Sequence, residues 1–178
     1  MQSLSDTVQC QGVIAAFNKP PIISKLPSID KNPLIILLDR VSDPGNVGTI
    51  IRTAYGLGAD AIIVVEGCDP WSPKVLRSAM GLCIKMPIIE CDKIPDLSQY
   101  NVYLADADEN AMIYNNVNMK LPTVIVIGNE ADGIRHTLFD NGIKIKIPMT
   151  RNLESLNAAV AASIIIAEAC KQRSSSGE

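Results

Sequence analysis

Runs of aliphatic residues alternate with segments of mixed polarity along most of the chain. Three runs without charged residues are typical of parallel strands buried on both faces: Leu34–Leu38, Ala61–Val65 and Thr123–Gly128. Weaker apolar segments predict three more short strands: Met86–Glu90, Val102–Ala105 and Lys144–Ile147. Polar and apolar residues alternate in the last of these, so we expect that strand to be half-exposed.

The segments between these runs carry helix signals. They predict helices over four ranges: Val47–Leu57, Ser72–Leu82, Ile134–Phe139 and Ser155–Gln172. Asn46 is a good N-cap for the first helix, and Ser72 followed by Pro73 opens the second. The last helix is rich in Ala and Ile and should be largely buried. Strands that alternate with helices predict an α/β domain with a mostly parallel sheet flanked by helices.

Composition indicates one globular domain with a full core. The chain has 178 residues, of which 47% are hydrophobic and 20% charged. Residues 1–30 are interpreted as a lead-in or linker, 31–173 as the domain and 174–178 as a tail. No apolar run approaches the ~20 residues of a membrane span. The first residues lack the features of a signal peptide, so we expect a cytoplasmic protein without membrane contact.

Charge and the reactive residue types exclude several chemistries. The net charge of −3 gives no support to nucleic-acid binding. Some basic residues could form a local basic face or simply a solvated surface: Lys74, Arg77, Lys85, Arg135 and Arg151. The five scattered cysteines and His136, interpreted as a surface helix residue, lack metal-ligand spacing, so no metal site is expected. The glycine-rich phosphate and dinucleotide motifs and the serine nucleophile elbow are also absent.

Three polar blocks lie where the chain leaves or enters buried structure, at residues 43–52, 127–134 and 147–157. Ligand sites in α/β proteins lie at the carboxyl ends of strands, so the blocks suggest one site assembled from distant segments. Arg52 lies on an apolar helix. It is either a surface residue or a ligand contact whose guanidinium binds a phosphate or carboxylate. Gly128 could serve a turn or the close approach of a ligand, and Ser155 and Asn157 could be helix caps or ligand contacts.

Taken together, the blocks resemble the motifs of the SpoU (TrmH) family of RNA ribose 2′-O-methyltransferases, in the SPOUT superfamily. The resemblance is carried, in order, by Asp43–Ala54, Gly128–Ile134 and Ile147–Ala161, with a further similar segment at Ser72–Gly81. It extends from about Gln11 to Lys171. It implies that residues 31–173 are a catalytic domain with a C-terminal trefoil knot, which periodicity alone does not indicate.

The resemblance also assigns roles to residues. It implies S-adenosyl-L-methionine as cofactor, held at the knot by these positions: Leu104, Ala105, Gly128, Ile147, Met149, Leu156 and Asn157. It implies these catalytic positions: Arg52, Asn46, Glu130, Ser155 and Asn157. Because an arginine is almost always charged, Arg52 is a poor base, and we expect it to bind an RNA phosphate and stabilise the developing oxyanion.

Partners follow from the same resemblance. It implies an RNA substrate, either ribosomal or transfer RNA with ribosomal RNA favoured, and a homodimer in which Arg52 of one subunit reaches toward the cofactor of the other. Many relatives carry an N-terminal RNA-binding domain, which would be missing from this chain. Two alternatives stay open: a non-catalytic RNA-binding or ribosome-assembly protein, disfavoured by the intact polar positions, and an ordinary Rossmann enzyme, disfavoured by the missing glycine fingerprint.

Overall fold

One parallel sheet organises the part of the chain that the structure describes. The computed structural model describes residues 18–21, 23–136, 139, 141–151 and 153–174. The sheet has the order β3-β2-β1-β6-β4-β7-β5, and all neighbouring strands run parallel. The strands are β1 Leu34–Asp39, β2 Ala61–Val65, β3 Ile88–Cys91, β4 Asn101–Ala105, β5 Met112–Ile113, β6 Thr123–Gly128 and β7 Ile143–Lys146.

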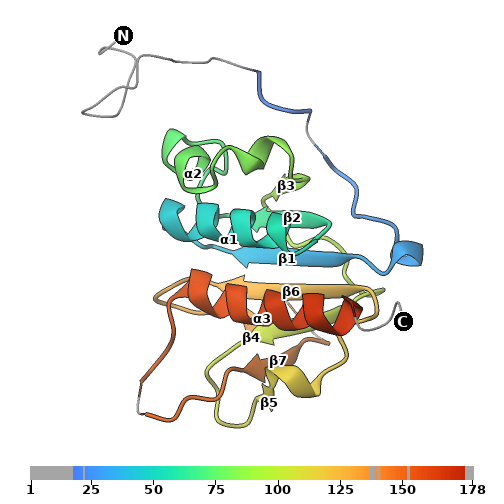
Figure 1. Cartoon of the computed structure of the whole chain (residues 1–178), viewed down its shortest axis with the longest axis vertical. Coiled ribbons are helices and arrows are strands. Elements are labelled where there is room, and N and C mark those ends of the chain that lie inside the picture. Colours follow the sequence, from blue (N-terminus) through green and yellow to red (C-terminus); the bar gives the residue numbers. More distant parts are fainter. Residues whose placement is uncertain (1–17, 22, 137–138, 140, 152, 175–178) are drawn as a thin grey trace.

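Helices cover one face of this sheet. The α-helices are α1 Pro44–Gly56, α2 Pro73–Ser78 and α3 Ala158–Ser174, and short 3₁₀ turns lie at Ile29–Lys31, Leu82–Ile84 and Tyr114–Asn116. Helices α1 and α3 lie side by side over β1 and β6 (Figure 1). The Ser163 hydroxyl of α3 lies 3.3 Å from the Thr53 hydroxyl of α1. The sequence prediction of a parallel sheet flanked by helices is confirmed.

Alternation along the strands divides the core into two layers. Ile36 and Leu38 of β1 pack with the helices, whereas Ile35 and Leu37 point to the opposite face. That face is covered by side chains from irregular segments, among them Leu97 and Phe139. Every residue of β1 and β2 is buried, as expected for strands inside a parallel sheet.

The long strands were predicted within two residues at each end, but three helix boundaries were wrong. Helix α1 begins at Pro44, because the carboxylate of Asp43 caps it by accepting from the Asn46 backbone amide at 2.8 Å. Asn46 is therefore inside the first turn and its side chain is available for other contacts. Helix α2 ends at Ser78, because Met80 and Gly81 adopt left-handed backbone conformations with φ of 53° and 74°.

Helix α3 begins later than predicted and is less buried. It starts at Ala158, and Asn157 caps it by accepting from the amides of Ala159 and Val160. Its buried residues form one face, whereas Val160 on the other side is 49% exposed, so the helix is buried on one side rather than all round.

The predicted helix at 134–139 is shorter than expected where it can be tested. His136 is in a 3₁₀ turn, Ile134, Arg135 and Phe139 are not helical, and residues 137 and 138 lie outside the described part. The short strand β5 was not predicted. The trefoil knot stays a prediction. No helix in the described residues has the length and apolar character needed to cross a membrane.

Candidate functional site

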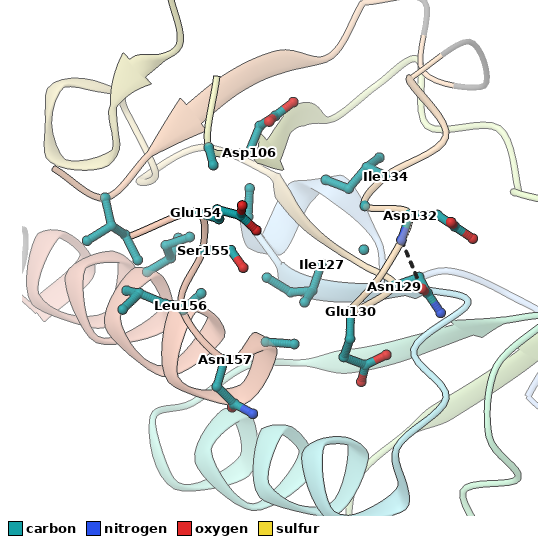
Figure 2. A pocket seen from close by; sticks show the side chains of 18 of the residues that line it. Asp106, Ile127, Asn129, Glu130, Asp132, Ile134, Glu154, Ser155, Leu156 and Asn157 are labelled. Atoms are coloured by element: carbon teal, nitrogen blue, oxygen red, sulfur yellow. Dashed lines mark hydrogen bonds between the residues drawn. The ribbon is translucent and has the colours of Figure 1, made fainter. Parts of the chain in front are cut away.

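A cavity of about 580 Å³ opens at the carboxyl ends of β4, β6 and β7. Its wall is built from three stretches of chain: residues 105–107 after β4, residues 127–134 around the end of β6, and residues 145–158 from β7 to the start of α3. Figure 2 shows Glu130 and Ile134 on one side of the cavity and Ser155 and Leu156 on the other. The volume lies within the range of about 300–1,000 Å³ that is usual for small-molecule sites.

The loop after β6 is compact and exposes backbone to the cavity. Asn129 and Gly133 form an antiparallel bridge, and the Asn129 side chain accepts from the amides of Ala131 and Asp132 at 2.8 and 3.1 Å. A Cβ on Gly128 would lie 2.4 Å from the carbonyl carbon of Gly133. Gly128 is therefore required by the close approach of its own loop, whereas the sequence had suggested a turn or the approach of a ligand.

A chain of side-chain hydrogen bonds joins the three polar blocks. Asn46 donates from Nδ2 to Glu130 at 2.9 Å, and Asn157 donates from Nδ2 to Asn46 Oδ1 at 3.0 Å. Ser42 also donates from its hydroxyl to Glu130 at 3.3 Å. Partial desolvation raises the pKa of Glu130, but the hydrogen bonds from Asn46 and from backbone amides outweigh it and hold the pKa below its ordinary value. Glu130 is therefore an anionic acceptor at neutral pH.

The cavity wall is rich in carboxylates. Asp106, Glu130, Asp132 and Glu154 line it, and no lysine or arginine does so within the described residues. Two cations lie behind this wall: Lys144 is 3.4 Å from Asp106, and Arg40 is 3.6 Å from Asp132. A concave surface with this charge favours ligands that carry positive charge.

Most of the predicted site residues converge on the cavity. It is lined by Ala105, Gly128, Glu130, Ile147, Met149, Ser155, Leu156 and Asn157. Leu104 does not line it, because its side chain is buried in the opposite layer of the core. Asn46 reaches the site through its hydrogen bonds to Glu130 and Asn157.

Arg52 lies outside this cavity. It is an exposed residue of α1 and forms no hydrogen bond or ion pair with any residue in the described part of the chain. A second, shallower groove of about 490 Å³ runs between α1 and α3 and includes Asn46 and Val160, but Arg52 does not line it either. Asn157 lines both the cavity and the groove and so lies at their boundary.

Sequence reasoning missed two features of this region. His136 was interpreted as a surface helix residue; its side chain is 38% exposed, but it also lines the cavity and lies 2.8 Å from Asp106. Arg135 is partly exposed but forms an ion pair with the fully buried Asp39, although Arg135 had been assigned to a possible basic surface. The available signal for Asp39 was a carboxylate that ends an otherwise apolar strand, since such a charge is buried only with a partner.

Comparisons with known proteins agree with this architecture. Residues 33–167 match the model of the SpoU rRNA Methylase family, so the chain belongs to that family. An uncharacterized tRNA/rRNA methyltransferase of Synechocystis is 29% identical over 97% of this chain and 65% of its own length. The 23S rRNA (guanosine(2553)-2′-O)-methyltransferase RlmP of Bacillus subtilis is 33% identical over 74% of this chain and 56% of its own length.

Solved structures give the same result. The rRNA methyltransferase of Sinorhizobium meliloti, crystallised with AdoMet, has a TM-score of 0.71 and 34% identity, covering 78% of this chain and 56% of that one. The family resemblance inferred from the three blocks is therefore confirmed. This chain spans only 51% to 65% of the length of the curated relatives that match it over most of its residues.

Proposed function

We propose that this chain transfers a methyl group from S-adenosylmethionine to the 2′-hydroxyl of a ribose in structured RNA. The observation that carries the proposal is the hydrogen-bonded chain Glu130–Asn46–Asn157, which joins three distant motifs beside one cavity. The names of relatives supply the reaction class: the Bacillus subtilis relative is a 2′-O-methyltransferase of 23S rRNA. Ribosomal RNA is the substrate we favour over transfer RNA, because a human relative is also named for rRNA.

The cavity has the chemistry that S-adenosylmethionine requires. This cofactor carries a sulfonium and an ammonium group, and the wall presents four carboxylates and no lysine or arginine among the described residues. We assign its binding to the loop at Gly128 and to the segment from Ile147 to Leu156, which face each other across the cavity. When bound, the cofactor supplies an electrophilic methyl group. The protein supplies position, since methyl transfer depends on alignment of donor and acceptor.

Arg52 is assigned to the RNA. Its guanidinium is exposed and without a described partner, so it can bind a phosphate with both prongs of its fork. Arginine stays protonated, so Arg52 acts by stabilising the negative charge that develops on the ribose oxygen rather than by removing the proton. Ser155 is exposed at the cavity wall and has a hydroxyl that can hold the ribose or the cofactor.

We further propose a homodimer in which Arg52 serves the cavity of the partner subunit. Arg52 does not line the cavity of its own subunit, which supports an action in trans. Tyr55 of α1 and Val160 of α3 are 41% and 49% exposed, and large apolar side chains exposed on two adjacent helices suit an interface.

The proposal is tested by incubating the chain with S-adenosylmethionine and either ribosomal or transfer RNA. Ribose methylation is then mapped by mass spectrometry, and cofactor binding is measured by calorimetry with S-adenosylhomocysteine. We expect a 2′-O-methyl group at a defined nucleotide of ribosomal RNA. Methylation of a base would contradict the proposed reaction, methylation of transfer RNA alone would overturn the substrate preference, and cofactor binding without methylation of either RNA would favour a non-catalytic role.

A further inference from the structure

Asp39, the last residue of β1, holds a buried negative charge. Its side chain is completely inaccessible to solvent. Arg135 donates to its Oδ1 from Nε at 2.8 Å and from Nη2 at 2.5 Å, and the Arg135 backbone amide donates to Oδ2 at 2.9 Å. The hydrogen bonds and charge of Asp39 raise the pKa of Arg135 above its ordinary value. A buried carboxylate costs free energy unless it is paired in this way, so the two residues are mutually dependent.

The pair fixes one end of the loop that lines the cavity. Arg135 directly follows Ile134, and the loop from Asn129 to Ile134 forms part of the cavity wall (Figure 2). Arg40, the residue directly after β1, holds the loop at two more points. Asn129 donates to the carbonyl oxygen of Arg40 at 2.9 Å, and the Arg40 guanidinium donates to the carbonyl oxygen of Gly133 at 3.2 Å.

Backbone strain occurs at the same place. Arg40 and Glu66 follow the adjacent strands β1 and β2, and both have left-handed conformations, with φ of 58° and 48°. Such conformations are unfavourable for residues other than glycine and are kept where surrounding contacts require them. Arg40 contacts the loop directly at Gly133, whereas Glu66 lies 2.5 Å from Nη1 of Arg135, the residue that follows the loop.

We propose that Asp39 and Arg135, together with Arg40, are positioning residues that set the shape of the loop Asn129–Ile134 and thereby the affinity for the cofactor. This inference rests on the proposed function. None of the three residues lines the cavity, so they act through the loop and not by contact with the ligand. An ion pair that satisfies a buried carboxylate contributes little net stability compared with an apolar replacement, which leaves fixed geometry as the main gain from this pair.

The test compares Arg135→Lys and Asp39→Asn with a matched arginine elsewhere. Lysine at position 135 keeps the positive charge but loses the planar guanidinium. Asparagine at position 39 keeps the shape of the side chain but replaces one carboxylate oxygen with an NH₂ group, which would face a donor of Arg135. The control is Arg173→Ala. Arg173 lies in the last turn of α3, near the amino ends of β1 and β6, where it donates to the carbonyl oxygen of Leu121 at 2.8 Å and also to the carbonyl oxygen of Asn32. Both guanidinium groups make several hydrogen bonds, Arg135 to the carboxylates of Asp39 and Glu66 and Arg173 to backbone carbonyls, but only Arg135 is next to the cavity.

Four quantities are measured for each variant: Tm, the Kd for S-adenosylhomocysteine, and KM and kcat with saturating RNA. For Arg135→Lys we expect the Kd and the KM for the cofactor to rise about tenfold, since a misplaced binding loop costs one to two orders of magnitude, with kcat at saturating cofactor nearly unchanged. Arg173→Ala should lower Tm without changing Kd. An unchanged Kd in Arg135→Lys, or a Kd that follows Tm equally in both variants, would overturn the proposal.

Hydrogen exchange separates this inference from the proposed function. The amides of Ala131 and Asp132 are bonded to Asn129 within the loop, and their exchange needs no ligand. We expect faster exchange at these amides in Arg135→Lys and Asp39→Asn and no change in Arg173→Ala. If the wild-type protein binds no cofactor but these amides still exchange faster in the two variants than in wild type, the loop positioning is supported while the proposed function fails. Unchanged exchange would overturn the positioning itself, whatever the cofactor does.

Discussion

The side chain of Asn157 donates a hydrogen bond to Asn46 at 3.0 Å, although 111 positions separate them in the sequence. The same Asn46 amide donates to Glu130 from its other end at 2.9 Å. The amide at position 46 therefore needs an acceptor on one side and a donor on the other. The ionised Glu130 carboxylate can only accept hydrogen bonds. Its charge therefore fixes which group donates in both hydrogen bonds, from Asn157 to Asn46 and from Asn46 to Glu130.

The two roles of Asn157 can be separated by substitution. Asn157→Asp keeps an oxygen to cap α3 but has no donor for Asn46, whereas Asn157→Ala loses both functions. We expect Asn157→Ala to lower the free energy of unfolding by about 1 kcal/mol and Asn157→Asp to lower it less. Both variants should lose methyl transfer. Urea denaturation and a transfer assay measure the two effects, and full activity in Asn157→Asp would show that the link to Asn46 is dispensable.

Gly128 should tolerate no side chain. In Gly128→Ala the new Cβ would lie 2.4 Å from the Gly133 carbonyl carbon, so the loop must shift. We expect about 1–3 kcal/mol of destabilisation and weaker binding of S-adenosylhomocysteine, measured by denaturation and calorimetry. The control is Gly56→Ala at the end of α1, where a Cβ would meet nothing within 4 Å and alanine favours the helix. Equal behaviour of the two variants would contradict the prediction.

Glu130 should contribute stability above its ordinary pKa of 4.5 and lose it on acidification. Its pKa in the folded protein is lowered, so the unfolded chain takes up the proton first as the pH falls. The contribution is complete above about pH 4.5 and disappears as the pH falls through the lowered value in the folded state. The difference in unfolding free energy between wild type and Glu130→Gln should therefore shrink below pH 4.5. A difference that grows as the pH falls would contradict a lowered pKa of Glu130 in the folded state.

Arg52→Ala should reduce methyl transfer by at least about 100-fold while leaving the Kd for S-adenosylhomocysteine unchanged. Mixing Arg52→Ala with Gly128→Ala subunits tests the action in trans. A mixed dimer then contains one site with an intact cofactor loop and an intact arginine from its partner, so activity should return. Mixtures that stay inactive would indicate that Arg52 acts on the site of its own subunit. An active Arg52→Ala protein would show that Arg52 is not needed for methyl transfer.

Val160→Glu should dissociate the proposed dimer. Val160 is 49% exposed on α3 beside the groove with α1, and a carboxylate there would have to be buried in the interface. Light scattering at micromolar concentration should give the dimer mass for wild type and the monomer mass for the variant. Leu121→Glu is the control, because Leu121 is 48% exposed and lies outside the groove. A monomeric wild type would refute the dimer.

The sequence predicted the sheet well because burial on both faces leaves an unmistakable pattern. Leu34–Leu38 and Thr123–Gly128 contain no charged residue, and both became central strands. The helix starts were less predictable. Asp43 and Asn46 are both good caps three positions apart, and only the structure shows that Asp43 caps while Asn46 joins the site. β5 has two residues, too few for any period to be detected.

The candidate site was predictable as a set of residues but not as a set of contacts. The motifs placed Gly128, Glu130 and Ser155 together, and all three line one cavity. Periodicity carries no information about pairs such as Asp39 and Arg135, which are 96 positions apart. Such a pair is visible in the sequence only as two charges near apolar runs, and each has many conceivable partners.

The position of α3 has a consequence for the growing chain. Ala158, Ala161 and Ile165 of this last helix form part of the cavity wall, and Asn157 completes the hydrogen-bonded chain. During synthesis the earlier strands can pair first, since the amino-terminal part emerges first. The cavity cannot close until the residues of α3 have left the ribosome and packed against α1. A nascent chain is therefore unable to form the proposed site for the methyl donor until α3 has packed against the earlier elements.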